Sequence, residues 1–167
     1  MTGDKPDPRL RTPMQWTPGR AAGFTTGAPW EPLQPDTATA NVAVETRDSA
    51  SLLTHYRKLI HLRSNTVALA AGDFLPLQSS DPAVAAFLRR DGAHVVLVVA
   101  NLATTPRAGV TLATGDAALP TARYTTRDLL SGGVGGPLTI GVDGRVNAYV
   151  PIATLAPRRT YVLDLTH

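Results

Sequence analysis

The stretch HVVLVVAN, residues 94–101, decides the fold class of this chain. Its centre, 95–99, holds five branched aliphatic residues without the alternation of apolar and polar positions that marks a half-exposed strand. Such a continuous run predicts a central strand covered on both faces. The run AVAAFLRRD, 83–91, precedes it across Gly92, and glycine adopts the positive φ of a tight hairpin turn at little steric cost. We therefore expect a hairpin over 83–101.

Six further β-like runs, separated by turns, extend outward from this hairpin. They are DFLPLQ (73–78), RAGVTLA (107–113), ARYTTRDLL (122–130), PLTIGV (137–142), RVNAYV (145–150) and RTYVLDL (159–165). Asp143-Gly144 is a second expected hairpin turn. The glycine cluster SGGVGG, 131–136, is expected to be a flexible loop, and without a lysine or a following helix it is no phosphate cradle. From Val67 onward we therefore predict an antiparallel β-sandwich of about 100 residues.

One segment, 48–65, shows a clear helical period. Its apolar stripe consists of Leu52, Tyr56, Leu59 and Ile60. Asp48 or Ser49 can cap the first amides, and Asn65 is a suitable stop. His55 and His61 are six residues apart and so lie on different faces, which argues against a shared metal ion.

The first 48 residues contain seven of the fourteen prolines and show no sustained period, which predicts loops and turns without a helix. A structureless loop of this length is uncommon in a compact domain unless it is functional or packs against something else. Both tryptophans, Trp16 and Trp30, lie here. They could anchor the loop on a core, or they could stack on sugar rings, and anchoring is the favoured interpretation.

Composition excludes several classes of function. The chain has no cysteine, so disulfides, zinc-thiolate sites and thiol nucleophiles are absent. The formal net charge of +3 is spread evenly along the chain, which argues against nucleic acid as a partner. No apolar run is long enough to span a bilayer, and the start MTGDKPDPRL lacks the apolar centre of a signal peptide. We expect a cytoplasmic protein without a membrane partner.

Self-contained catalysis is not expected. Only two glutamates are present, Glu31 and Glu45, and neither has a local spacing to an aspartate that would suggest an acid and base pair. No strained GxSxG turn is found, and we predict no catalytic residue, no metal and no cofactor in this chain.

Residues 1–64 contain motifs that resemble one family. RTPMQW (11–16), AGFTTGAPWEPL (22–33) and NVAVETRDSASLLTHYRKLIHLR (41–63) are similar to the C-terminal part of the α-amylase superfamily, glycoside hydrolase family 13. The resemblance is nearest to the oligo-1,6-glucosidase, α-glucosidase, trehalose synthase and related α-amylase branches. It implies a long loop and a last helix from the end of a (β/α)8 barrel, followed by an all-β C-terminal domain. Beyond Val67 the match is mostly one of pattern.

The resemblance also implies where function lies. The family's three catalytic carboxylates belong to earlier barrel strands, and retaining hydrolysis needs two of them about 5 Å apart, so this chain alone should be inactive. Arg11, Gln15 and Trp16 match the family motif near the catalytic end of the barrel. Phe24 and Trp30 extend the same loop. Bracing the loop is the favoured role for these residues, ahead of direct sugar contact, and Thr17 stands where the family usually has aspartate.

We therefore expect this chain to be a non-catalytic C-terminal fragment of an α-glucosidase or α-amylase-like enzyme. Residues 1–66 would complete the barrel, and 67–167 would form the β-sandwich that covers or stabilises it. The expected partners are the missing barrel and an α-glucan or maltooligosaccharide substrate of the parent enzyme. The apolar helix stripe is expected to be covered either by a second copy of the chain or by residues 1–48 folded back onto the helix. Two alternatives stay open: a stand-alone glycan-binding β-sandwich, and an interaction module that docks onto a separate barrel.

Overall fold

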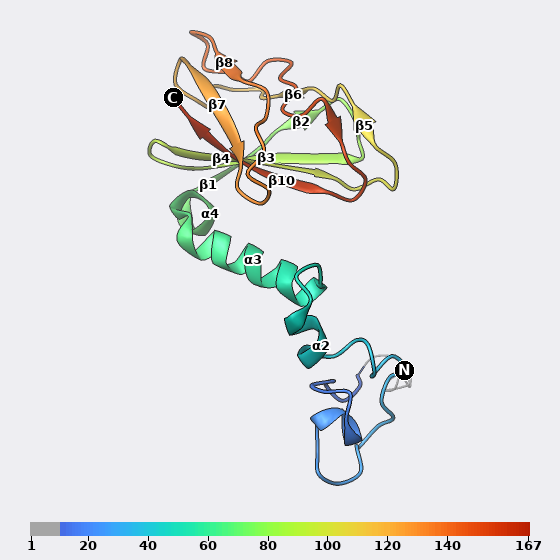
Figure 1. Ribbon diagram of the computed structural model, residues 1–167. Helices are drawn as coiled ribbons and strands as arrows, with labels where there is room; N and C mark the ends of the chain where they lie inside the picture. Colours follow the sequence, from blue (N-terminus) through green and yellow to red (C-terminus); the bar gives the residue numbers. More distant parts are fainter. Residues whose placement is uncertain (1–10) are drawn as a thin grey trace, which may run out of the picture. The chain divides into compact units, whose positions relative to one another are not determined.

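The computed structural model describes residues 11–167, which divide into two compact units, Met1–Ile60 and His61–His167. The first unit is described from Arg11 onward. Figure 1 shows the helices and strands of both units. The predicted fold class is confirmed, because antiparallel sheet dominates and the helices are few.

A six-stranded antiparallel sheet forms the frame of the second unit. In spatial order its strands are β1 (Asp73–Pro76), β3 (Val84–Asp91), β4 (His94–Asn101), β10 (Thr160–Thr166), β7 (Ala122–Asp128) and β8 (Leu138–Ile140). Two short pairs accompany it: β2 (Gln78–Ser79) with β6 (Leu112–Ala113), and β5 (Arg107–Ala108) with β9 (Thr154–Leu155). These pairs lie over one side of the large sheet (Figure 1), so the second layer of the sandwich is short and partly irregular.

Strand β4 is central and covered on both faces, as predicted. Val95, Leu97 and Val99 enter the main core, where they meet side chains of the second layer such as Leu112 and Leu155. On the opposite face, Val96 belongs to a smaller cluster with residues of α4 (Val67–Ala71). Burial of one such aliphatic side chain contributes roughly 1.5–3 kcal/mol, which explains why the uninterrupted apolar run fixes the position of this strand.

The predicted β3–β4 hairpin is confirmed. Asp91 pairs with His94 across a two-residue turn, and Gly92 has a φ of 58°. The second turn also forms, with Gly144 at a φ of 70°. However, the strand predicted over 145–150 is wrong: this segment is irregular, and only Tyr149 makes a β-bridge, to Leu112.

One further expectation for this unit needs correction. Residues after Val67 begin with helix α4 rather than with a strand, because the alanine-rich VALAA has high helix propensity and buries Ala68 and Leu69. A Cβ atom at the following Gly72 would lie 2.6 Å from the carbonyl oxygens of both Ala68 and Arg90, so only glycine fits this junction.

The loop 131–136, for which flexibility stays a prediction, lies between two hydrogen-bonded segments. The carboxylate of buried Asp128 accepts hydrogen bonds from the backbone N–H of Leu130 and of Val162, at 3.1 and 3.2 Å. At the other end the N–H of Gly136 donates to the carbonyl of Pro151 at 2.8 Å. Backbone groups that lie near a core are normally paired in this way.

The first unit contains η1 (Arg20–Gly23), α2 (Val42–Arg47) and the start of α3 (Leu52–Asn65). The expectation of no helix before residue 48 is wrong for α2, because Asn41 caps it: its Oδ1 accepts from the N–H of Val44 at 3.0 Å. The division between the two units falls within α3, after Ile60.

Helix α3 lies inside the predicted segment and ends at Asn65, as expected. Its cap differs from the prediction: Ser51 Oγ accepts from the N–H of Thr54 at 3.1 Å, whereas the Asp48 carboxylate accepts from the N–H of Ala50, before the helix starts. The apolar stripe is largely bare, since Leu52, Tyr56 and Ile60 are 65%, 58% and 59% exposed.

Candidate functional site

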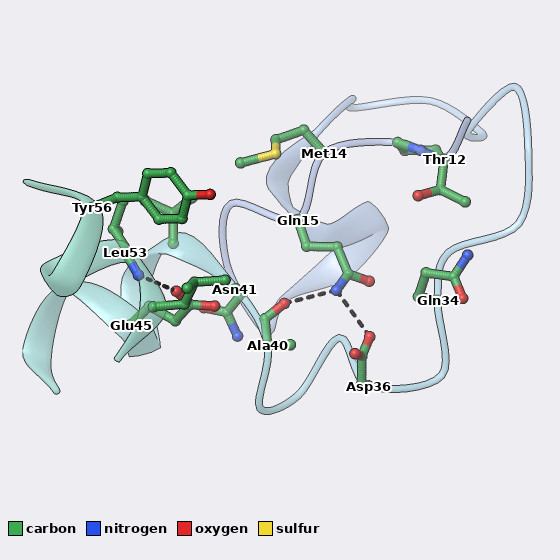
Figure 2. A pocket seen from close by; sticks show the side chains of 13 residues that line it. Thr12, Met14, Gln15, Gln34, Asp36, Ala40, Asn41, Glu45, Leu53 and Tyr56 are labelled. Carbon is green, nitrogen blue, oxygen red and sulfur yellow. Dashed lines mark hydrogen bonds between the residues drawn. The ribbon is translucent and has the colours of Figure 1, made fainter. Parts of the chain in front are cut away.

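An open hollow of about 470 Å³ lies in the first unit. It is bordered by the RTPMQW stretch, by the segment that leads into α2, and by the first turns of α3; its walls include Thr12, Met14, Gln15, Asp36, Leu52 and Tyr56. Figure 2 shows Met14, Gln15, Asp36 and Tyr56 around the hollow, on separate parts of the chain. The hollow therefore combines an apolar wall with a polar one, as small-molecule sites commonly do.

Gln15 is the organising residue of the polar wall. Its Nε2 donates to Asp36 Oδ1 at 3.2 Å and to the carbonyl of Ala40 at 2.7 Å, and its Oε1 accepts from the hydroxyl of Thr37. Both amide hydrogens are therefore in use, and no donor of this side chain is left for a ligand. The geometry gives Gln15 a bracing role within the described chain.

The backbone of the same stretch is held against the start of α2. The carbonyls of Gln15 and Trp16 accept from the N–H groups of Val42 and Ala43, each at 3.0 Å. These are two of the first N–H groups of the helix, which have no partner inside it. The RTPMQW stretch and the start of α2 thus form one closed frame, although the bonded residues are 27 positions apart in sequence.

The two tryptophans are not buried anchors in the described chain. Trp16 is 49% exposed and Trp30 is 52% exposed, so neither is a buried anchor within the described residues, and anchoring on a separate core stays a prediction. Arg11, another of the expected site residues, lies with its guanidinium carbon 5.4 Å from the centre of the Trp30 ring. This cation–π contact joins the two ends of the first loop.

Phe24 lies apart from Gln15, beside a second hollow lined by residues 20 and 23–26. It follows a left-handed turn in which Ala21, Ala22 and Gly23 have φ values of 50°, 54° and 68°. Left-handed alanines cost roughly 1–2 kcal/mol each. The buried Ala22 carbonyl compensates, because it accepts from the N–H groups of Trp16 and Thr17 at 2.9 and 3.0 Å.

The structure thus separates the five expected site residues. Gln15 faces the first hollow, Phe24 the second, Arg11 stacks on Trp30, and Trp16 contributes its backbone to the frame. Sequence reasoning missed Asp36, Asn41 and Glu45, which lie on the first hollow. For Asn41 a signal existed, because asparagine before VAVE is a helix start.

The two carboxylates of the first hollow make hydrogen bonds within the first unit. Glu45 accepts from the N–H of Leu53 at 3.0 Å and Asp36 from Gln15, so both serve local structure. Across residues 11–167, no three histidine, aspartate or glutamate side chains gather in a way that could hold a metal ion. In the same range no helix is long and apolar enough to cross a membrane.

Comparison with known proteins relates the start of the chain to one protein family. Residues 1–72 match the family model described as "Alpha amylase, catalytic domain". The chain is homologous to enzymes of this family, glycoside hydrolase family 13, and the branch suggested by the sequence motifs is consistent with its relatives.

Two of the similar proteins are glucosidases. The chain is 37% identical over 91 residues to an oligo-1,6-glucosidase of Bacillus cereus, covering 54% of this chain and 16% of that enzyme. It is 40% identical over 92 residues to a glucan 1,6-alpha-glucosidase of Streptococcus pneumoniae, covering 55% and 17%.

Solved structures extend the likeness across almost the whole chain. The trehalulose synthase MutB from Pseudomonas mesoacidophila MX-45 is 28% identical with a TM-score of 0.64, and the match covers 93% of this chain and 25% of that one. An isomaltulose synthase from Klebsiella sp. LX3 is 29% identical with a TM-score of 0.62 and the same coverage. The chain therefore spans about a quarter of these enzymes and a smaller part of the curated relatives.

Proposed function

We propose that this chain provides the last loop and helix of a catalytic barrel, residues 1–66, together with the β-sandwich domain, residues 67–167, of an enzyme that acts on α-glucosidic bonds. The chain itself carries no catalytic carboxylate in this proposal. The observation that supports it is the likeness to sugar-converting enzymes, which covers 93% of this chain and only 25% of theirs.

The first unit supports the same proposal from its own geometry. A loop of more than thirty residues is held in one ordered frame without a core of its own, and the neighbouring helix leaves Leu52, Tyr56 and Ile60 bare. Apolar area of this kind usually marks an interaction surface. In the proposal the barrel is the partner that covers it, and Gln15 braces the loop at the barrel's catalytic end.

A chimera tests the proposal. In the oligo-1,6-glucosidase of Bacillus cereus, the matching segment and everything that follows it are replaced by the full chain, and hydrolysis of isomaltose is measured. We expect the chimera to be active, and both the truncated Bacillus enzyme and this chain alone to be inactive. A soluble, folded chimera without activity, or hydrolysis by this chain alone, would overturn the proposal.

A matched pair of variants then tests the bracing role. In the chimera, Gln15→Leu removes three hydrogen bonds from the frame and should lower kcat/KM by at least about tenfold. Gln78→Leu makes the same chemical change at an exposed position of β2 and should leave kcat/KM unchanged. Equal effects of the two substitutions would show that Gln15 has no particular role.

A further inference from the structure

The wall of the second hollow carries a positive charge and no acidic group within the described chain. The hollow is open, measures about 640 Å³ and is lined by Arg20, Gly23, Phe24, Thr25 and Thr26. The exposed Arg20 side chain has no hydrogen-bond or ion-pair partner among residues 11–167. A positive charge without a counter-charge on the same wall attracts an anion.

The backbone of the same segment offers further donors. Gly23 has a φ of 68°, and Phe24 follows it with a φ of −76° and a ψ of −40°, so a left-handed residue precedes a right-handed helical one. Successive N–H groups in a turn of this kind form a concavity that suits an anion. The N–H of Phe24 donates to the carbonyl of Ala21 at 2.9 Å, whereas the N–H groups of Thr25 and Thr26 have no partner in the part of the chain that the structure describes. Two amide donors are therefore left for a ligand.

The two threonine side chains add hydroxyl donors. Thr25 Oγ1 accepts from the backbone N–H two residues further on at 3.1 Å and keeps its hydrogen for another acceptor. The Thr26 hydroxyl has no partner within residues 11–167. The turn that carries these groups is itself fixed, because the Ala22 carbonyl accepts from the N–H groups of Trp16 and Thr17. The donors are therefore positioned before a ligand arrives, which lowers the entropic cost of binding.

A phosphoryl group matches this set of donors. A carboxylate has two oxygens and can be paired by one guanidinium, whereas a phosphoryl group presents three strong acceptor oxygens and up to two negative charges. Guanidinium groups and turns of free backbone N–H groups are both suited to phosphate. Phe24, which is 42% exposed on the same hollow, offers an apolar face to the organic group that carries the phosphate.

We propose that the second hollow binds the phosphoryl group of a small phosphate ester. Arg20 supplies the counter-charge, Thr25 and Thr26 supply hydroxyl and N–H donors, and Phe24 packs against the organic part. The site uses residues 20 and 23–26 and shares none of them with the first hollow or with the bare stripe of α3. The inference therefore does not depend on the proposed function.

Titration of the full chain with phenyl phosphate and with inorganic phosphate, at constant ionic strength and followed by NMR chemical shifts, tests the proposal. We expect saturable shifts at residues 20–26 with both probes. Arg20→Gln should weaken both at least about tenfold, because a charge-assisted hydrogen bond is lost. Arg123→Gln removes the same charge from an exposed position of β7 and should have no effect.

A second matched pair tests the hydroxyl donors. Thr26→Val keeps the shape of the side chain and should weaken both probes roughly fivefold, because one hydrogen bond to a charged group is lost. Thr139→Val makes the same change at an exposed position of β8 and should leave binding unchanged. Equal binding by the two threonine variants would remove this hydroxyl from the site and contradict the proposal.

Phe24→Ala distinguishes an ester from the free ion. It should weaken phenyl phosphate about fivefold and leave inorganic phosphate within about twofold. If both probes bind equally well and neither responds to this substitution, the ester is refuted and the hollow is a site for inorganic phosphate.

Two results would overturn the site altogether. They are the absence of saturable shifts at residues 20–26 in both the full chain and the chimera, and equal losses of binding in Arg20→Gln and Arg123→Gln. An active chimera that binds no phosphate would refute the site and leave the proposed function standing. An inactive, folded chimera that binds phosphate would do the reverse.

Discussion

At the scale of single residues, burial changes the pKa of the Tyr149 hydroxyl. Its hydroxyl is buried and donates to the carbonyl of Gly136 at 2.6 Å, and burial raises its pKa to about 12, partly opposed by the Thr126 side chain. The unfolded chain has the ordinary value of 10.0. Because the folded pKa is the higher one, its stabilising effect is complete below pH 10 and is lost as pH rises from 10 to 12.

We therefore expect the free energy of unfolding to fall over this range by roughly 1–2 kcal/mol from this residue, less than the full shift implies because the group is partly screened by solvent. Tyr149→Phe should remove that part of the alkaline loss, measured by urea unfolding at pH 9, 10 and 11. Tyr56→Phe, at an exposed position, serves as the control and should keep the wild-type slope. An unchanged slope in Tyr149→Phe would show that this hydroxyl does not set the alkaline limit.

At the same scale, the family resemblance predicted a bracing role for Gln15 but not the partners that carry it. Its partners Asp36, Thr37 and Ala40 lie 21 to 25 residues away, and no local period links them. Only the resemblance pointed to the RTPMQW stretch. Which atoms of a motif are already satisfied within the protein is a tertiary property, and here it decides between bracing and sugar contact.

At the scale of elements, the N-terminal cap of helix α3 can be tested by substitution. Ser51 Oγ accepts from the N–H of Thr54 and donates to the carbonyl of Glu45 at 2.7 Å. Ser51→Ala should therefore lower stability by about 1 kcal/mol through loss of the cap, measured by thermal unfolding. Ser49→Ala, at the serine that the sequence had suggested, is exposed and should be nearly neutral. A larger loss of stability in Ser49→Ala than in Ser51→Ala would instead identify Ser49 as the cap.

The elements that the sequence predicted well are those with one dominant local signal. Strand β4 has an unbroken apolar run, and α3 has a helical stripe and a clear stop at Asn65. The segment 145–150 has a strand-like composition, but its chain bends at Ala148, where φ is 45°, and only Tyr149 pairs. Three capping residues lie within 48–51, so local preference cannot select among them, and the contact with Glu45 does.

At the scale of the whole molecule, the bare face of α3 should control association. Leu52, Tyr56 and Ile60 are each more than half exposed, and burial of such side chains against any apolar partner is favourable by about 25 cal/mol per Å². In the isolated chain the available partner is a second copy. We expect light scattering to show mass increasing with concentration, and the double variant Leu52→Glu, Ile60→Glu to remain monomeric.

The barrel and a second copy of the chain would compete for this face of α3. Light scattering of the chimera and of the chain alone can therefore distinguish the two. If the barrel covers α3 in the complete enzyme, the chimera has no bare stripe and should be monomeric at concentrations where the chain alone associates. In the chimera the double variant should then lose solubility or activity, because two charges would be buried without partners. A chain that is monomeric at all concentrations, or a chimera indifferent to both glutamates, would mean that this face is simply solvated.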